Sequence, residues 1–174
     1  WKVDRIYEPA PLEFDGREVP RGFDVLTGSY TPWRNPVTQL PLGQRAVVRL
    51  RVTRPGEVRH PDDTLDYLVL TEPLPSGAQI MEGSIEGTFE RYELGPGYIR
   101  FYLGQQRSAT DLKFDLYGYL PGEYRTAPTV LRSYYHPEQM VVTEPGSLAV
   151  LAADARSGDE YRKTPRELFE LGKR

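Results

Sequence analysis

A short apolar alternation, broken every few residues by proline or glycine, constrains the fold of this chain more than any other feature. Successive side chains of a β-strand point to opposite faces of its sheet, so apolar residues at every second position mark a strand with one buried face. Residues 46–52 follow this period and end at Arg54-Pro55-Gly56. Residues 99–103 and 112–116 repeat it. Half-buried strands are therefore the predicted building blocks.

Four further segments have the character of strands. They are residues 2–7, 65–71, 86–94 and 147–151. Residues 65–71 are apolar on both faces, which is typical of a central strand, and the prolines that follow end it. Two more extended pieces, 23–26 and 37–40, lie in a region rich in proline and glycine. No helix is predicted between the strands, which favours an all-β fold, an immunoglobulin-like antiparallel β-sandwich. A closed barrel would give the same pattern.

Tyrosine is the unusual residue, with 12 copies in 174 residues. A polar link, residues 104–110, separates two of the clearest alternations, so these strands are predicted to pair as antiparallel neighbours. Four tyrosines occupy their outward positions, namely Tyr98, Tyr102, Tyr117 and Tyr119. An exposed aromatic face would suit a sugar or a protein partner, because tyrosine combines a large contact area with a polar tip. Cross-strand pairing, or a cover provided by another sheet or loop, would explain the same residues.

The end of the chain changes character. Residues 152–163 are polar and resemble a linker, and Thr164-Pro165-Arg166-Glu167 is a helix-capping box. The predicted organisation is a β-sandwich domain over 1–151, a linker over 152–163, and the start of a short helix over 164–174. This helix either docks on the sandwich or opens a following domain. The second is favoured because its apolar face needs a partner.

Composition excludes several classes of function. The 22 basic and 25 acidic residues are spread along the chain, so no basic surface for nucleic acid is predicted. The absence of cysteine excludes disulfides, thiolate metal sites, cysteine nucleophiles and a thioester within this segment. No apolar run approaches the ~18 residues of a membrane span, so no membrane insertion is expected.

No catalytic residue or cofactor is predicted. The two histidines, His60 and His136, are far apart and lack metal-ligand spacing. The acidic turn at residues 60–66 lacks the spacing of a calcium loop. Residues 83–87 contain Gly-Ser-Ile-Glu-Gly, which lacks the strand-turn-helix context of a serine nucleophile.

Four segments, in order along the chain, carry a resemblance. They are GQRAVVRLRV at 43–52, LTEPLPSG at 70–77, PGEYRTAP at 121–128 and YYHP at 134–137. Together they resemble the final macroglobulin-type, receptor-binding-like domain of the bacterial alpha-2-macroglobulin family, whose Pro-Gly-x-[Phe/Tyr]-x-x-x-Pro turn precedes a Met-Tyr-x-Pro segment. The resemblance covers about residues 43–151. The chain departs from it at Tyr134, where the family has methionine, and at Glu72, where it has aspartate.

The resemblance implies a non-catalytic module of a large secreted, periplasmic or cell-surface bacterial protein that traps and inhibits proteases. Its expected partners are the adjacent domains of the parent chain, a thioester-containing helical domain among them, and target proteases through the parent. Five residues on the matching segments are the implied domain-interface candidates, namely Tyr124, Arg125, Tyr134, Tyr135 and His136.

Two other functions remain open from the residues. An adhesion or carbohydrate-binding module of a bacterial surface protein would use the tyrosine face. A small secreted hydrolase would build its site from dispersed acidic residues.

Overall fold

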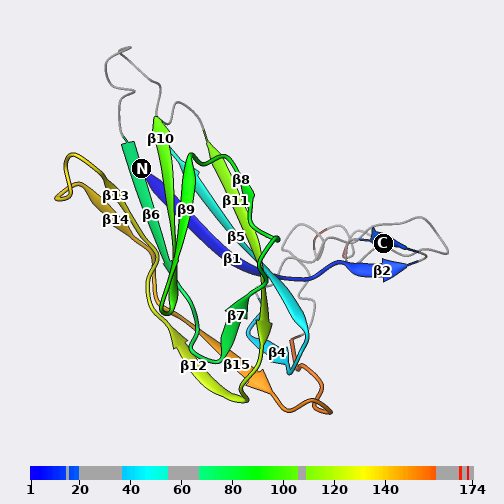
Figure 1. Cartoon of the computed structure of the whole chain (residues 1–174). Coiled ribbons are helices and arrows are strands. Elements are labelled where there is room, and N and C mark those ends of the chain that lie inside the picture. Colours follow the sequence, from blue (N-terminus) through cyan, green and yellow to red (C-terminus); the bar gives the residue numbers. More distant parts are fainter. Residues whose placement is uncertain are drawn as a thin grey trace.

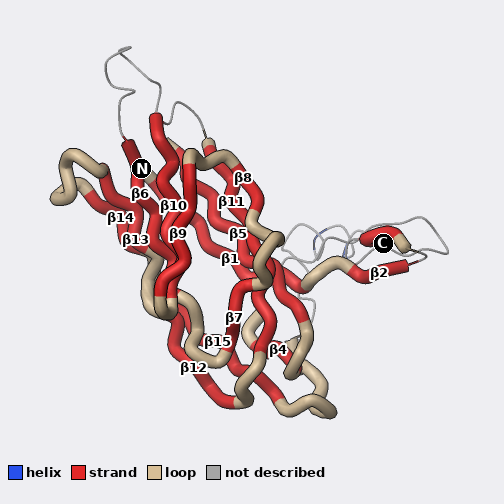
Figure 2. The backbone as a smooth tube through the Cα atoms, in the orientation of Figure 1, coloured by secondary structure: helices blue, strands red, loops and turns tan. Residues whose placement is uncertain are grey.

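The structure is a computed structural model, and it describes residues 1–14, 16–19, 37–54, 67–105, 109–159, 169 and 172. Within these residues the chain forms strands joined by turns and loops (Figures 1 and 2). The first sheet has the order β1-β5-β11-β7, and β8 also pairs with β11. Its strands are β1 (Lys2–Pro9), β5 (Arg45–Thr53), β7 (Ala78–Ile80), β8 (Glu86–Gly87) and β11 (Thr110–Gly118). All of these pairings are antiparallel.

The second sheet is also antiparallel and has the order β14-β13-β6-β10-β9. Its strands are β6 (Tyr67–Pro73), β9 (Arg91–Gly95), β10 (Tyr98–Gln105), β13 (Val130–Ser133) and β14 (Met140–Val142). A smaller third sheet has the order β12-β15-β4, in which β15 and β4 are parallel. Its strands are β4 (Gln39–Pro41), β12 (Gly122–Thr126) and β15 (Gly146–Leu151). The hairpin of β2 (Leu12–Phe14) and β3 (Arg17–Val19) stands apart (Figure 1).

The core lies between the first two sheets. Strands β5 and β11 contribute every second side chain, as the period of two predicts, and Phe101 of β10 meets Phe114 of β11 with ring centroids 6.4 Å apart. The largest completely buried apolar residues around them are Val48, Leu50, Val52, Leu70, Ile99, Leu112 and Leu116. The prediction of an antiparallel β-sandwich is confirmed.

The predicted pairing of residues 99–103 with 112–116 is wrong. Strand β10 pairs with β6 and β9, whereas β11 pairs with β5, β7 and β8. The link between them crosses from one sheet to the other, so the two strands face each other across the core. Alternation identifies the buried face of a strand but not its hydrogen-bonding neighbour, and strands that pair and strands that stack give the same pattern.

Most other strand predictions are confirmed, and some boundaries change. The segment predicted as one strand over 86–94 is two short strands, β8 and β9, in different sheets. The piece at 37–40 overlaps β4, whereas the piece at 23–26 lies outside the described residues. The predicted helix at 164–174 falls, apart from Phe169 and Gly172, outside them as well.

The first part of the predicted linker is attached to the sandwich. Asp159 accepts hydrogen bonds from the backbone N–H groups of Thr38 and Gln39, both at 2.9 Å, and from the Thr38 hydroxyl. The Gly158 N–H donates to the Gln39 side chain at 2.7 Å. Residues 152–159 are therefore tied back to strand β4 and its neighbour.

We expect Phe114→Ala to lower the free energy of unfolding by about 3–5 kcal/mol, because the two packed sheets would close the resulting cavity only in part. Urea unfolding measures this change. Tyr117→Ala, on the outward face of the same strand, is the matched control and should cost no more than about 1 kcal/mol. Equal losses from the two variants would contradict the assignment of the inward face.

Candidate functional site: the β13–β14 hairpin

Strands β13 and β14 form a hairpin at the edge of the second sheet, residues 130–142, with an exposed apolar surface. The exposed fractions of Tyr134, Tyr135, Met140 and Val142 are 60%, 65%, 60% and 51%. Single exposed apolar residues are common, but a gathering of four on one short hairpin is the kind of surface that marks an interaction site. In Figure 1 the hairpin projects beside β6.

The tip of the hairpin has a defined structure. The Tyr135 ring meets Tyr67 of β6 edge to face, with centroids 5.5 Å apart, and meets Tyr134 in the same way at 5.3 Å. The Tyr134 N–H donates to the Tyr67 carbonyl at 2.6 Å. Within the turn, the His136 N–H donates to the Ser133 hydroxyl at 3.2 Å. The exposed tyrosines are thus held in place before any partner arrives.

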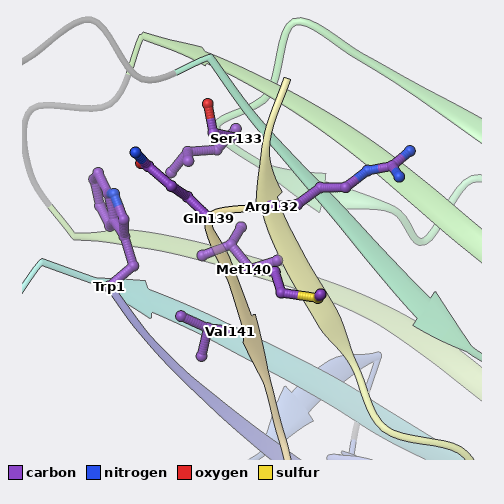
Figure 3. Close-up of a pocket in the computed structure, with 8 residues that line it drawn as sticks. Trp1, Arg132, Ser133, Gln139, Met140 and Val141 are labelled. Atoms are coloured by element: carbon purple, nitrogen blue, oxygen red, sulfur yellow. The ribbon is translucent and has the colours of Figure 1, made fainter. Parts of the chain in front are cut away.

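A pocket of about 220 Å³ lies beside the hairpin (Figure 3). Leu68 and Leu131, both buried, contribute to its lining, and the Gln139 side chain points toward Trp1 (Figure 3). The side chains of Arg132 and Met140 point away from Trp1. The pocket thus lies between Trp1 and the hairpin.

A buried polar cluster fixes the base of the hairpin. Arg5 of β1 donates to the carbonyls of Ala127, at 2.8 Å, and Glu144, at 2.9 Å, which lie just outside the two ends of the hairpin. The Glu72 carboxyl group is completely buried, lies 3.4 Å from the Arg5 guanidinium, and accepts a hydrogen bond from the Thr129 hydroxyl. We refer to Arg5, Glu72 and Thr129 as the base cluster.

The hairpin ends are also tied to each other. The Thr129 N–H donates to the Thr143 hydroxyl at 2.9 Å, and the Thr143 N–H donates to the Thr129 carbonyl at 3.0 Å. Strand β1 therefore positions the hairpin through Arg5, and β6 positions it through Glu72.

Burial dominates the electrostatics of this cluster. It raises the pKa of Glu72 to about 7, and the weaker opposing effects are the charge of Arg5 and hydrogen bonds to the carboxylate. Burial, followed by the nearby Glu72 charge, also raises the pKa of Tyr7 above its usual range. The folded state therefore favours the neutral form of Glu72.

Three of the five interface candidates are brought together. Tyr134, Tyr135 and His136 are consecutive and exposed at the hairpin tip. Tyr124 and Arg125 lie instead on β12 of the third sheet. The Tyr124 ring packs over the backbone of Gly77, where an added Cβ would lie 2.0 Å from the ring, and its hydroxyl donates to the Leu120 carbonyl at 3.0 Å. Tyr124 thus anchors its own loop.

The four outward tyrosines do not form one face. Tyr98 and Tyr102 belong to the second sheet, whereas Tyr117 belongs to β11 in the first sheet and Tyr119 lies just after that strand. The guanidinium of Arg91 lies 3.5 Å from the centre of the Tyr102 ring, and the Tyr102 hydroxyl donates to the Glu93 carboxylate on β9. Tyr102 thus makes the kind of cross-strand contact that the sequence left open.

Sequence reasoning missed the base cluster, although a signal was present. Arg5 takes an inward position between Val3 and Tyr7, and Glu72 takes the next inward position after Leu70. Opposite charges at inward positions of two strands indicate a buried pair. Among the described residues, no group of three or more histidines and acids is placed to hold a metal ion, and no helix there is long and apolar enough to cross a membrane.

The fold is similar to solved bacterial structures. A fragment of Escherichia coli alpha-2-macroglobulin, from domain MG7 to the C-terminus, matches 86% of this chain at 12% identity with a TM-score of 0.61. Salmonella alpha-2-macroglobulin reacted with methylamine matches 86% at 13% identity with a TM-score of 0.57. The N-terminal domain of a Streptococcus gordonii adhesin matches 66% at 10% identity with a TM-score of 0.50.

These likenesses establish a shared fold. This chain spans 23%, 9% and 30% of the length of those three chains, respectively. No family model matches the sequence, and no curated protein matches it.

We expect Glu72 to make stability depend on pH. Its pKa is about 7 in the folded protein, against 4.5 for the free side chain, so between these values the folded state binds more protons than the unfolded state. The stability it contributes is complete below about pH 4.5 and is lost as the pH rises through about 7, a change on the order of 3 kcal/mol.

Glu72→Gln removes this dependence because the amide does not titrate. The unfolding free energy of the variant, measured by urea denaturation from about pH 4 to 8, should rise relative to the natural protein as the pH rises. Glu123→Gln, at an exposed position of β12, controls for the change of residue type. A difference between the natural protein and Glu72→Gln that stays constant with pH would rule out the titration of Glu72.

Proposed function

We propose that this chain is a non-catalytic β-sandwich module of a larger bacterial envelope protein of the alpha-2-macroglobulin kind, which packs against neighbouring domains. The observation that carries the proposal is the ordered, exposed apolar surface of the hairpin. Tyr134, Tyr135 and Met140 are each at least 60% exposed, and their hairpin is anchored from beneath by the base cluster. A surface that is both apolar and pre-organised is suited to burial against another domain.

The parent protein is proposed to trap proteases at the cell surface or in the periplasm. The structural likeness to alpha-2-macroglobulins from two bacteria and the four ordered sequence motifs support this proposal. The domain facing the hairpin would be the thioester-containing helical domain, and the tyrosine rings would exclude water from that contact. Target proteases would be met by the parent chain and not by this module alone.

We expect the hairpin to be covered in the parent protein. Amide hydrogen exchange over residues 130–142 should be about tenfold slower in the parent protein than in the isolated chain, because an interface suppresses local opening. Replacing Tyr134 and Tyr135 together by serine should remove most of this protection. Tyr117→Ser, on the outer face of the first sheet, is the matched control. Equal exchange in the parent and the isolated chain would refute the interface.

Protease trapping is tested separately on the parent protein. After incubation with a broad-specificity serine protease, the parent should retain the protease in a complex that is visible by size-exclusion chromatography. The double serine variant should form about tenfold less of this complex. In that variant, water would reach and hydrolyse the thioester that the interface is proposed to shield. If the double variant traps as much protease as the natural parent protein, the proposed role of the hairpin in trapping is wrong.

A further inference from the structure

A groove of about 500 Å³ opens at the other end of β6 from the hairpin. The hairpin meets β6 at Tyr67, the first residue of the strand, whereas the groove is lined by Leu74, just beyond its last residue. In Figure 1 the β13–β14 hairpin and β7 lie toward opposite ends of β6. The groove is therefore a second surface, separate from the one proposed to face a neighbouring domain.

The walls of the groove are fixed by hydrogen bonds within the protein. The Leu74 N–H donates to the Gly97 carbonyl at 2.8 Å, which ties the turn after β6 to the turn between β9 and β10. The Tyr119 hydroxyl donates to the Ser76 carbonyl at 2.8 Å. The groove is thus formed without a ligand, so that binding would involve little ordering of the protein.

Two tyrosines flank the groove. Tyr98 packs against the backbone of Gly95, and the Arg100 guanidinium lies over its ring, 5.0 Å from the ring centre, so Tyr119 offers the more accessible ring. Tyr119 is 50% exposed. Between them, Ala78 and Ile80 contribute buried apolar surface. Aromatic rings beside an apolar floor fit the C–H faces of a pyranose ring, which is apolar on its faces and polar at its rim.

The polar groups of the groove are suited to a ligand with hydroxyl groups. The side chains of Gln79 and Glu82 are exposed, and neither makes a hydrogen bond to another described residue. Glu82 is the one carboxylate among the described lining residues, which include no lysine or arginine, so an anionic ligand is disfavoured. The Tyr119 O–H already donates to the Ser76 carbonyl, so the Tyr119 oxygen is left to accept a hydrogen bond from a ligand hydroxyl.

We propose that this groove binds a neutral oligosaccharide, with Tyr119 against a sugar ring and with Gln79 and Glu82 accepting hydrogen bonds from sugar hydroxyl groups. The proposal does not depend on the hairpin interface.

The test is titration of the isotope-labelled chain with neutral hexasaccharides of 1,4-linked glucose and of 1,4-linked N-acetylglucosamine, followed by amide NMR shifts. At least one sugar should give saturable shifts at the groove residues below about 10 mM. Tyr119→Ala and Glu82→Gln should each weaken binding about tenfold. Tyr119→Phe keeps the ring and should retain binding.

Tyr135→Ala, which removes an exposed tyrosine beside Tyr67 at the far end of β6, is the control and should bind as the natural protein does. Amide spectra that retain their dispersion establish that each variant is folded. The proposal is overturned if neither sugar gives saturable shifts, if the groove variants bind normally, or if a polyproline peptide shifts the groove residues and the sugars do not.

Discussion

The buried contact between the Arg5 guanidinium and the Glu72 carboxyl group is the interaction on which the arrangement of the second half of the chain depends. Burying a charged group has a desolvation cost of several kcal/mol, which is offset only where hydrogen bonds satisfy that group. Here Arg5 bonds to two backbone carbonyls as well as to Glu72, and Glu72 also accepts from Thr129. Removing either side chain alone would leave a buried polar group of the other without its hydrogen-bond partner, so the cluster fixes one position for the segments it joins.

Those segments carry the exposed tyrosines. A two-stranded hairpin is only marginally stable by itself in water, and β14 pairs with β13 alone among the described strands. The hairpin holds its shape because β6 supports one side and the base cluster ties both of its ends to β1 and β6. The protein can therefore present several apolar side chains to solvent without letting them collapse onto its own core. The same contacts link the protonation of Glu72 to the part of the molecule proposed to meet a partner.

The sequence predicts well which face of each long strand is buried, and it predicts poorly which strands pair with each other in a sheet. The apolar period of two identifies β5, β10 and β11 and their inward residues, and the strand character of further segments indicates β1, β6 and β15. It does not distinguish strands that share a sheet from strands that stack across the core, and Phe101 and Phe114 stack. Strands β7, β12, β13 and β14 have three to five residues each, too few to establish a period. The hairpin was found only through the Tyr134 and Tyr135 motif, because its geometry depends on long-range contacts of its tip with Tyr67 and of its ends with Arg5.

The direction of β6 separates the two surfaces of the module. Its seven residues span roughly 20 Å at the rise of a β-strand. Tyr67 at one end supports the hairpin, and the turn that begins at Leu74 beyond the other end forms a wall of the groove. A partner domain can therefore contact the hairpin without contacting the groove. Because β6 is central in its sheet and packs against the core through Leu68 and Leu70, it is a rigid spacer between them. One fold can thus attach to a larger protein at one end and keep a binding surface free at the other.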